Sequence, residues 1–124
     1  MSESPNFTDR LVSLFSGDTG AFDLIDSRHF NDDMEAHDPN LQERYWAEMS
    51  ANFQAAIVQA SAIWGEPVAR IRRDDDAADL WVDRTQLGFI EMVAWLREDG
   101  QHVFVLLAHE DRELPILLLA GVTA

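Results

Sequence analysis

The chain has 124 residues, contains no cysteine, and carries 23 acidic against nine basic residues, for a formal net charge of −14. This length suits one domain with a real core, the missing cysteines exclude disulfides and thiolate metal sites, and a field this negative repels nucleic acid and anionic membrane. No apolar run approaches the ~20 residues of a membrane helix and the first ten residues lack a secretory pattern, so we expect a single cytoplasmic domain.

The first half of the chain predicts two helices separated by an acidic segment. A helix is predicted over residues 5–16, where the apolar residues fall on one stripe. Residues 18–38 hold seven acids and one arginine, and we expect an ordered acidic loop with one helical turn near Phe22. The clearest element is a helix over residues 39–64, because Asp38 is a good N-cap and apolar residues then recur at steps of three and four.

After this helix the hydrophobic period changes to two, which indicates strands. The predicted strands lie at 67–73, 80–83 (a short piece), 87–96, 102–109 and 114–122. Helices that precede an antiparallel meander make an α+β domain. We therefore expect N-terminal helices, one long central helix, and then an antiparallel meander of three to five strands packed on the helices.

The two last hairpins can be placed in register from their turns. Asp99-Gly100 is a strong two-residue hairpin signal and would pair residue 96 with 103, and a turn at Asp111-Arg112 would pair 107 with 116. One face then carries Ile90, Met92, Ala94, Leu96, Val103, Val105, Leu107, Ile116, Leu118 and Ala120, and we expect the helices to cover it. The opposite face carries Val93, Trp95, Phe104, Leu106, Leu117 and Leu119.

That second apolar face needs a cover, since it would exceed the apolar patch that a soluble monomer usually exposes. Either residues 18–38 fold over it, or a second copy of the chain covers it. A homodimer is slightly favoured.

Residues 29–38 form the cluster that most resembles a metal site. His29, Asp33 and His37 are its candidate ligands, of a kind that suits zinc, manganese or iron. Their spacing matches no zinc or calcium motif, and charge runs are usually solvated. We therefore favour a solvated acidic loop and expect no cofactor.

Neither of two other candidates amounts to a catalytic site. The stretch HEDRELP, which begins at His109, is interpreted as a solvent-exposed turn between two buried strands rather than as a site of acid–base catalysis. Glu91 is predicted beside Trp95 on an apolar face, where it could act as a general acid or pair with Arg70 or Arg97. Nucleophile elbows, phosphate loops and cysteine nucleophiles are all missing from the sequence, which weakens the case for an enzyme.

The acid blocks 18–38 and 74–83, the helix 39–64 and the apolar meander 87–122 together resemble small, acidic bacterial immunity proteins, which inhibit toxins of contact-dependent and type VI secretion systems. The resemblance implies a non-catalytic protein that occludes the basic active-site cleft of a cognate toxin. The acid blocks and the last turn would supply the contact residues Asp32, Asp33, Glu35, Asp74, Asp75, Asp76, Asp79, Glu110 and Asp111.

Two alternatives stay open at this point. One is a small metal-dependent enzyme or sensor that uses His29, Asp33 and His37. The other is a secretion chaperone or adaptor whose apolar sheet face binds a segment of an effector.

Overall fold

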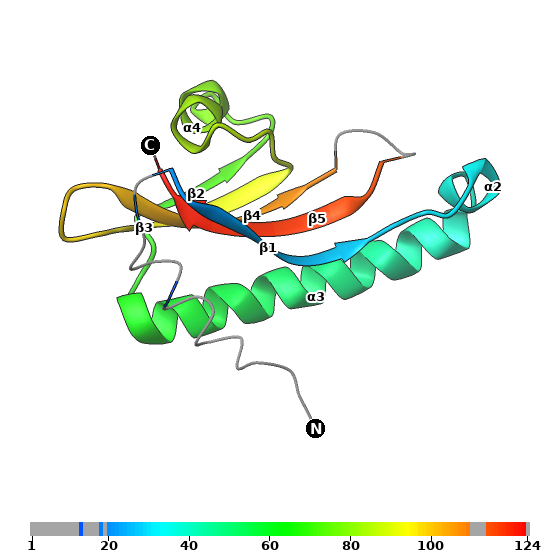
Figure 1. Ribbon diagram of the computed structural model, residues 1–124, viewed down its shortest axis with the longest axis horizontal. Coiled ribbons are helices and arrows are strands. Elements are labelled where there is room, and N and C mark those ends of the chain that lie inside the picture. Colours follow the sequence, from blue (N-terminus) through cyan, green and yellow to red (C-terminus); the bar gives the residue numbers. More distant parts are fainter. Residues whose placement is uncertain (1–12, 14–17, 19, 110–113, 124) are drawn as a thin grey trace.

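The computed structural model describes residues 13, 18, 20–109 and 114–123, and it has the predicted α+β architecture (Figure 1). A five-stranded antiparallel sheet has the strand order β1-β5-β4-β3-β2. The helix predicted over residues 5–16 lies, apart from Ser13, outside the described residues. In chain order the elements are β1 (Phe22–Arg28), α2 (Asp33–Ala36), α3 (Pro39–Trp64), β2 (Ala69–Arg72), α4 (Ala78–Thr85), β3 (Glu91–Leu96), β4 (His102–Ala108) and β5 (Ile116–Val122).

Helix α3 has the predicted bounds because both of its ends are capped. The Asp38 carboxylate accepts hydrogen bonds from the backbone N–H groups of Asn40 (2.9 Å) and Leu41 (3.3 Å). Gly65 ends the helix with φ 86°, a conformation that favours glycine, and its N–H bonds the carbonyl of Ser61 at 2.8 Å. In the described residues, no helix is both long and apolar enough to cross a membrane.

The acidic segment 18–38 contains a strand that the sequence analysis missed. β1 adds to the sheet beside β5, where we expected a loop with one helical turn. The register shifts between Leu24 and Asp26, so Ile25 is bulged and packs on the same side of the sheet as α3. Pairing with an apolar neighbour strand therefore overrides a local composition that is typical of a loop.

The first predicted hairpin register is wrong by one residue. Leu96 pairs with His102 rather than with Val103, because the loop is longer than the assumed two-residue turn. The N–H of Arg97 bonds the carbonyl of Gln101 at 2.8 Å, and the N–H of Gly100 bonds the carbonyl of Arg97 at 3.0 Å. A turn that is followed by a glycine at φ 88° is the three-residue hairpin with a bulge.

A shift of one residue turns every side chain of a strand to the opposite face. Val93 and Trp95 of β3 accordingly lie on the α3 side, whereas Met92 and Ala94, which were expected on that side, lie on the α4 side. The second predicted register is also wrong, since Leu107 pairs with Leu118 rather than with Ile116. That error is two residues, so the predicted faces of β5 stay correct; the turn itself lies outside the described residues.

The second face of the sheet is covered by α4, a helix where the sequence analysis placed the short strand 80–83 (Figure 1). Ala78, Trp81 and Thr85 are its buried residues, and they recur at steps of three and four. Together with Phe89 the helix buries the α4-side core, which includes Met92, Ala94, Phe104, Leu106, Ala108 and Leu119. The α3-side core holds Val93, Trp95, Val103, Val105, Leu107, Ile116, Leu118, Ala120 and Val122 against α3.

This arrangement removes much of the reason for expecting a homodimer. Among the six residues predicted to need a cover, Val93 and Trp95 lie under α3, and Phe104, Leu106 and Leu119 are buried on the α4 side. Leu117 is only partly buried. Within the described residues the cover is α4 rather than the segment 18–38. The homodimer stays a prediction, with less exposed apolar surface to support it.

We expect the two neighbouring leucines of β4 to be equally costly to truncate, because they fill different cores. Leu106 and Leu107 are both buried, on the α4 side and the α3 side respectively. Leu106→Ala and Leu107→Ala should each lower the free energy of unfolding by about 2–5 kcal/mol. Chemical denaturation measures this, with Val58→Ala as the control because Val58 is 68% exposed on α3. A small effect at Leu106 would show that α4 does not cover its face.

Gly121 should not tolerate a side chain, because strand β1 passes very close to it. A Cβ there would meet the carbonyl oxygen of Ala21 at 2.6 Å, Cβ of Phe22 at 2.8 Å and Cζ of Phe104 at 2.8 Å. Gly121→Ala should destabilise the protein by about 1–3 kcal/mol. Gly88→Ala is the matched control, since a Cβ there meets nothing within 4 Å. Equal thermal stabilities of the two variants would contradict the close approach of β1.

Candidate functional site

Two depressions of the surface lie where the chain leaves α4 and returns to the sheet. Gln86 ends the helix in the left-handed conformation (φ 62°), and its N–H bonds the carbonyl of Val82 at 2.8 Å. The buried Thr85 hydroxyl donates to the carbonyl of Trp81 at 2.8 Å, and it also accepts from the N–H of Leu87 at 3.3 Å. These bonds turn the chain sharply, so that residues 87–90 run back over the sheet.

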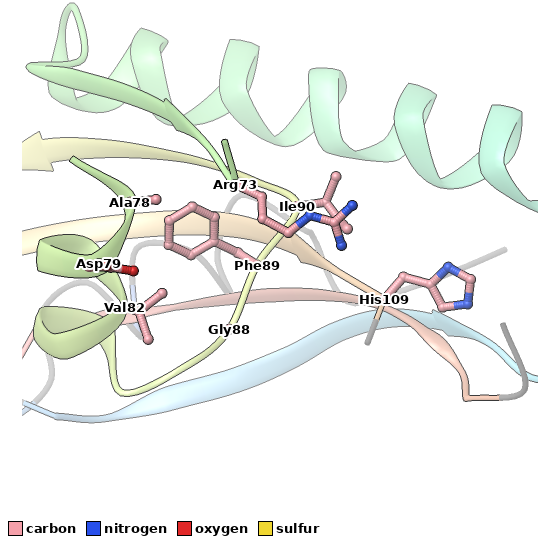
Figure 2. A pocket seen from close by; sticks show the side chains of 8 residues that line it. All are labelled: Arg73, Ala78, Asp79, Val82, Gly88, Phe89, Ile90 and His109. Carbon is pink, nitrogen blue, oxygen red and sulfur yellow. The ribbon is translucent and has the colours of Figure 1, made fainter. Parts of the chain in front are cut away.

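The larger depression beside this turn is a pocket of about 310 Å³, which we call the Arg73 pocket. Its walls are mostly apolar, and three ionisable side chains lie around it, from the end of β2, the first turn of α4 and the end of β4 (Figure 2). The lining residues are Arg73, Ala78, Asp79, Val82, Gly88, Phe89, Ile90 and His109.

The charged groups of the Arg73 pocket do not neutralise one another. Within the described residues, Arg73 and Asp79 form no ion pair. In Figure 2 the guanidinium of Arg73 points away from Asp79, and the ring of Phe89 lies between the two. His109 lies at the far margin, where its ring packs against Trp46 of α3, with centroids 5.4 Å apart. The pocket therefore offers separated polar groups around an apolar centre.

A second, apolar depression of about 200 Å³ lies on the other side of Gly88, and we call it the Leu117 pocket. It exists because α4 covers the β2–β3–β4 part of its face and leaves part of β5 less covered. Its lining residues are Leu87, Gly88, Ala108, Leu114, Pro115, Leu117 and Leu119.

The structure separates the two acid blocks that the sequence analysis combined. Asp32, Asp33 and Glu35 belong to α2 and its cap, beyond the N-terminal end of α3, whereas α4 lies on the opposite face of the sheet (Figure 1). A single contact surface therefore does not include both blocks. The α4 block holds Asp74, Asp75, Asp76 and Asp79, and Glu110 and Asp111 lie outside the described residues.

The candidate metal ligands do not converge. In the parts of the chain that the structure describes, no three histidine or acidic side chains are grouped so that they could hold a metal ion. His29 lies within 3.0 Å of the Ser27 hydroxyl. Asp32 and Asp38 act as helix caps, since their carboxylates accept the N–H groups of Glu35 and Asn40. Local hydrogen bonding to the backbone thus accounts for several acids of this segment.

Glu91 forms an ion pair with Arg70, one of the two arginine partners that the sequence analysis offered. The Nε of Arg70 donates to Oε2 of Glu91 at 2.9 Å, across the β2–β3 ladder. The carboxylate lies on the α3 side of the sheet with Trp95. It therefore faces away from both pockets.

A contact that the sequence analysis missed joins α4 to the start of β4. The rings of Trp81 and His102 meet edge to face, 5.0 Å apart, and the guanidinium of Arg84 lies 5.0 Å from the centroid of Trp81. Trp81 and Arg84 are three residues apart, a spacing that places them on one side of a helix. The signal was lost because residues 80–83 were interpreted as a strand.

Acidification should weaken this contact through His102. Burial lowers the pKa of His102 and the positive charge of Arg84 lowers it further, so the unfolded chain takes up the proton more readily than the folded one. Stability that is present above the ordinary histidine pKa of about 6.5 is therefore lost as the pH falls toward the lowered value. Urea unfolding between pH 7.5 and 5.5 should show a smaller loss for His102→Gln than for wild type, and Arg84→Gln should lie between them. Parallel profiles for all three proteins would contradict this.

The geometry thus consists of two adjoining depressions beside α4, and at the larger one Arg73 and Asp79 form no ion pair with any described residue. Searches of protein-family models, of curated proteins and of solved structures gave no significant match to this chain.

Proposed function

We propose that this chain is a non-catalytic binding protein that docks a basic protein partner on its α4 side. The observation that carries the proposal is the combination, on one side of the fold, of exposed apolar side chains with carboxylates that form no ion pair with any arginine the structure describes. We call this region the α4 surface; it consists of Asp74, Asp76, Asp79, Leu80, Val82 and Asp83.

Most of the described arginines form ion pairs with acids that lie outside the α4 surface. Arg28 bonds both Asp26 and Glu48, Arg70 bonds Glu91, and Arg97 bonds Asp99. By contrast, the carboxylates of the α4 surface form no ion pair with any described residue. They are exposed to solvent, so their negative potential is directed outward, toward an approaching partner.

The apolar part of the α4 surface supports contact rather than mere solubility. Leu80 is 51% exposed and Val82 is 37% exposed, on a helix whose buried side already packs against the sheet. Leu114, at the Leu117 pocket nearby, is 45% exposed. Protein interfaces combine a desolvated apolar centre with a polar rim, and pockets commonly receive the anchoring side chains of the partner.

Within this proposal we infer a role as an immunity protein, whose partner would be a toxin domain with a basic active-site cleft. A net charge of −14 would steer a cationic surface toward the chain. Of the two predicted contact blocks, we favour the α4 block, because its carboxylates lie beside exposed apolar side chains and two pockets. The metal-dependent enzyme is not favoured by any grouping of the described residues, and the adaptor remains a distinct outcome of the test.

The test pairs the chain with proteins encoded next to its gene. We expect one of them to be toxic, basic at its active site, and neutralised in a growth assay by the wild-type chain. Asp79→Lys with Asp83→Lys should slow association at least severalfold, because the substitutions reverse charge at the rim of the interface. The matched control is Asp32→Lys with Asp33→Lys, which makes the same charge change at α2 and should slow association less.

The dependence on salt distinguishes the outcomes. Association measured by stopped flow should slow as ionic strength rises, since the Debye length is about 8 Å at 0.15 M salt. If Asp32→Lys with Asp33→Lys slows association more than the α4 variant does, the interface lies at α2 instead. Capture of an effector segment without neutralisation of any toxin would favour the adaptor. An on-rate independent of salt and of both reversals would refute the electrostatic proposal.

A further inference from the structure

We propose that the Arg73 pocket binds a small organic carboxylate with an apolar body, independently of any protein partner. The carboxylate would sit on the guanidinium of Arg73, and the apolar body would lie on Phe89, Val82 and Ile90. The inference goes beyond the proposed function, because it concerns a small-molecule site in a protein whose net charge repels anions.

The side chain of Arg73 has no partner among the described residues. Among the described residues, its guanidinium forms neither an ion pair nor a hydrogen bond, although 23 acids are present in the chain and Asp74 follows it directly. Its backbone is fixed, because its N–H bonds the carbonyl of Ile90 at 2.9 Å. Figure 2 shows the side chain extending along the pocket toward the side where His109 lies. A planar guanidinium without a protein partner can bind a carboxylate through two parallel hydrogen bonds.

An apolar wall lies beside Arg73 in the pocket. Phe89 is buried, so its ring is a fixed surface, and Val82 and Ile90 extend that surface on either side (Figure 2). The pocket volume of about 310 Å³ is at the lower end of the range for ligand sites, which is roughly 300–1,000 Å³. The ligand is therefore small, of the size of one ring or a short branched chain with its carboxylate.

The charge of the protein favours a singly charged ligand. The net charge of −14 opposes a doubly charged anion such as phosphate more strongly than a monoanion. Asp79 lies on the other side of Phe89 from the guanidinium head, so it need not meet the carboxylate (Figure 2). At that end it favours a ligand with a hydrogen-bond donor. The negative charge of the whole protein thus repels the carboxylate, while the contact with the guanidinium attracts it. Binding of an anion therefore depends on Arg73.

The experiment uses the purified full chain and three probes of nearly equal shape: phenylacetate, the neutral phenylacetamide, and the cationic phenethylamine. Binding is measured by ligand-observed NMR and by the chemical-shift changes of the backbone amides of the protein during titration. We expect phenylacetate to bind more tightly than phenylacetamide, with shifts centred on residues 73, 82 and 88–90. Phenethylamine should cause only weak shifts spread over the acidic surface.

Two variants and one control separate the site from the overall charge. Arg73→Gln should weaken phenylacetate binding by about tenfold or more, since a charged hydrogen bond contributes roughly 1.5–3 kcal/mol. Arg72→Gln removes the same charge one residue away, from a side chain that does not line the pocket, and should leave binding unchanged within about twofold. Gly88→Leu should block the pocket without unfolding the protein, because a Cβ at Gly88 meets nothing within 4 Å. Circular dichroism checks that each variant is folded.

Several results would overturn the inference. Equal binding of phenylacetate to wild type and to folded Arg73→Gln would remove the proposed contact. Equal weakening by Arg72→Gln would reduce the effect to overall charge. Stronger binding of phenethylamine at residues 79–82 would assign the pocket to Asp79 and to cations instead. Failure of phenylacetate to bind at millimolar concentration would exclude the site.

Discussion

Strand β4 has apolar side chains on both of its faces, and the architecture follows from the need to remove both from water. Val103, Val105 and Leu107 face α3, while Phe104 and Leu106 face α4. An antiparallel sheet commonly leaves one face solvated, but here neither face of the central strand is polar. The chain therefore needs a helix on each side, although it is only 124 residues long.

The two helices do not cover the same part of the sheet. Helix α3 packs against β1, β4 and β5 and also covers Val93 and Trp95 of β3, whereas α4 lies against β2 and buries side chains of β3, β4 and Leu119 of β5. Only the centre of the sheet is thus covered on both faces. Where α4 ends, the sharp turn after Thr85 brings residues 87–90 back over the sheet, and the pockets form on either side of that return. The shape of the candidate site is a consequence of a short helix that covers a wide face.

Much of this fold could be predicted from the sequence, and the errors have definite physical causes. Helix α3 was predicted correctly because Asp38 and Gly65 cap it and its apolar residues repeat regularly. The faces of β3 were inverted because Asp99-Gly100 also fits a three-residue loop, and one residue of loop length decides the register. α4 was missed because its eight residues contain too few turns to distinguish a helical from a strand period.

The candidate site was less predictable than the fold. Arg73 and Asp79 are close in the sequence, but His109 is far from both and the three belong to no motif; the packing of α4 on the sheet brings them around one pocket. The acidic composition was evident from the sequence, but its division between α2 and α4 was not. Which charges share a surface depends on the topology of the chain, and composition does not carry that information.

The bulge at Ile25 has a consequence for how the protein avoids unwanted self-recognition. An edge strand with a regular ladder and apolar side chains is a template on which another chain can add, and Phe22 and Leu24 of β1 are exposed apolar residues in such a strand. The bulge interrupts the alternation after Leu24 and places Asp26 on the α3 side, where its carboxylate bonds Arg28 and the amide of Asn52. A straight, unbroken copy of β1 would expose a longer cross-β template. A bulge in an edge strand makes that strand a poorer template for the addition of another chain, and β1 has this feature.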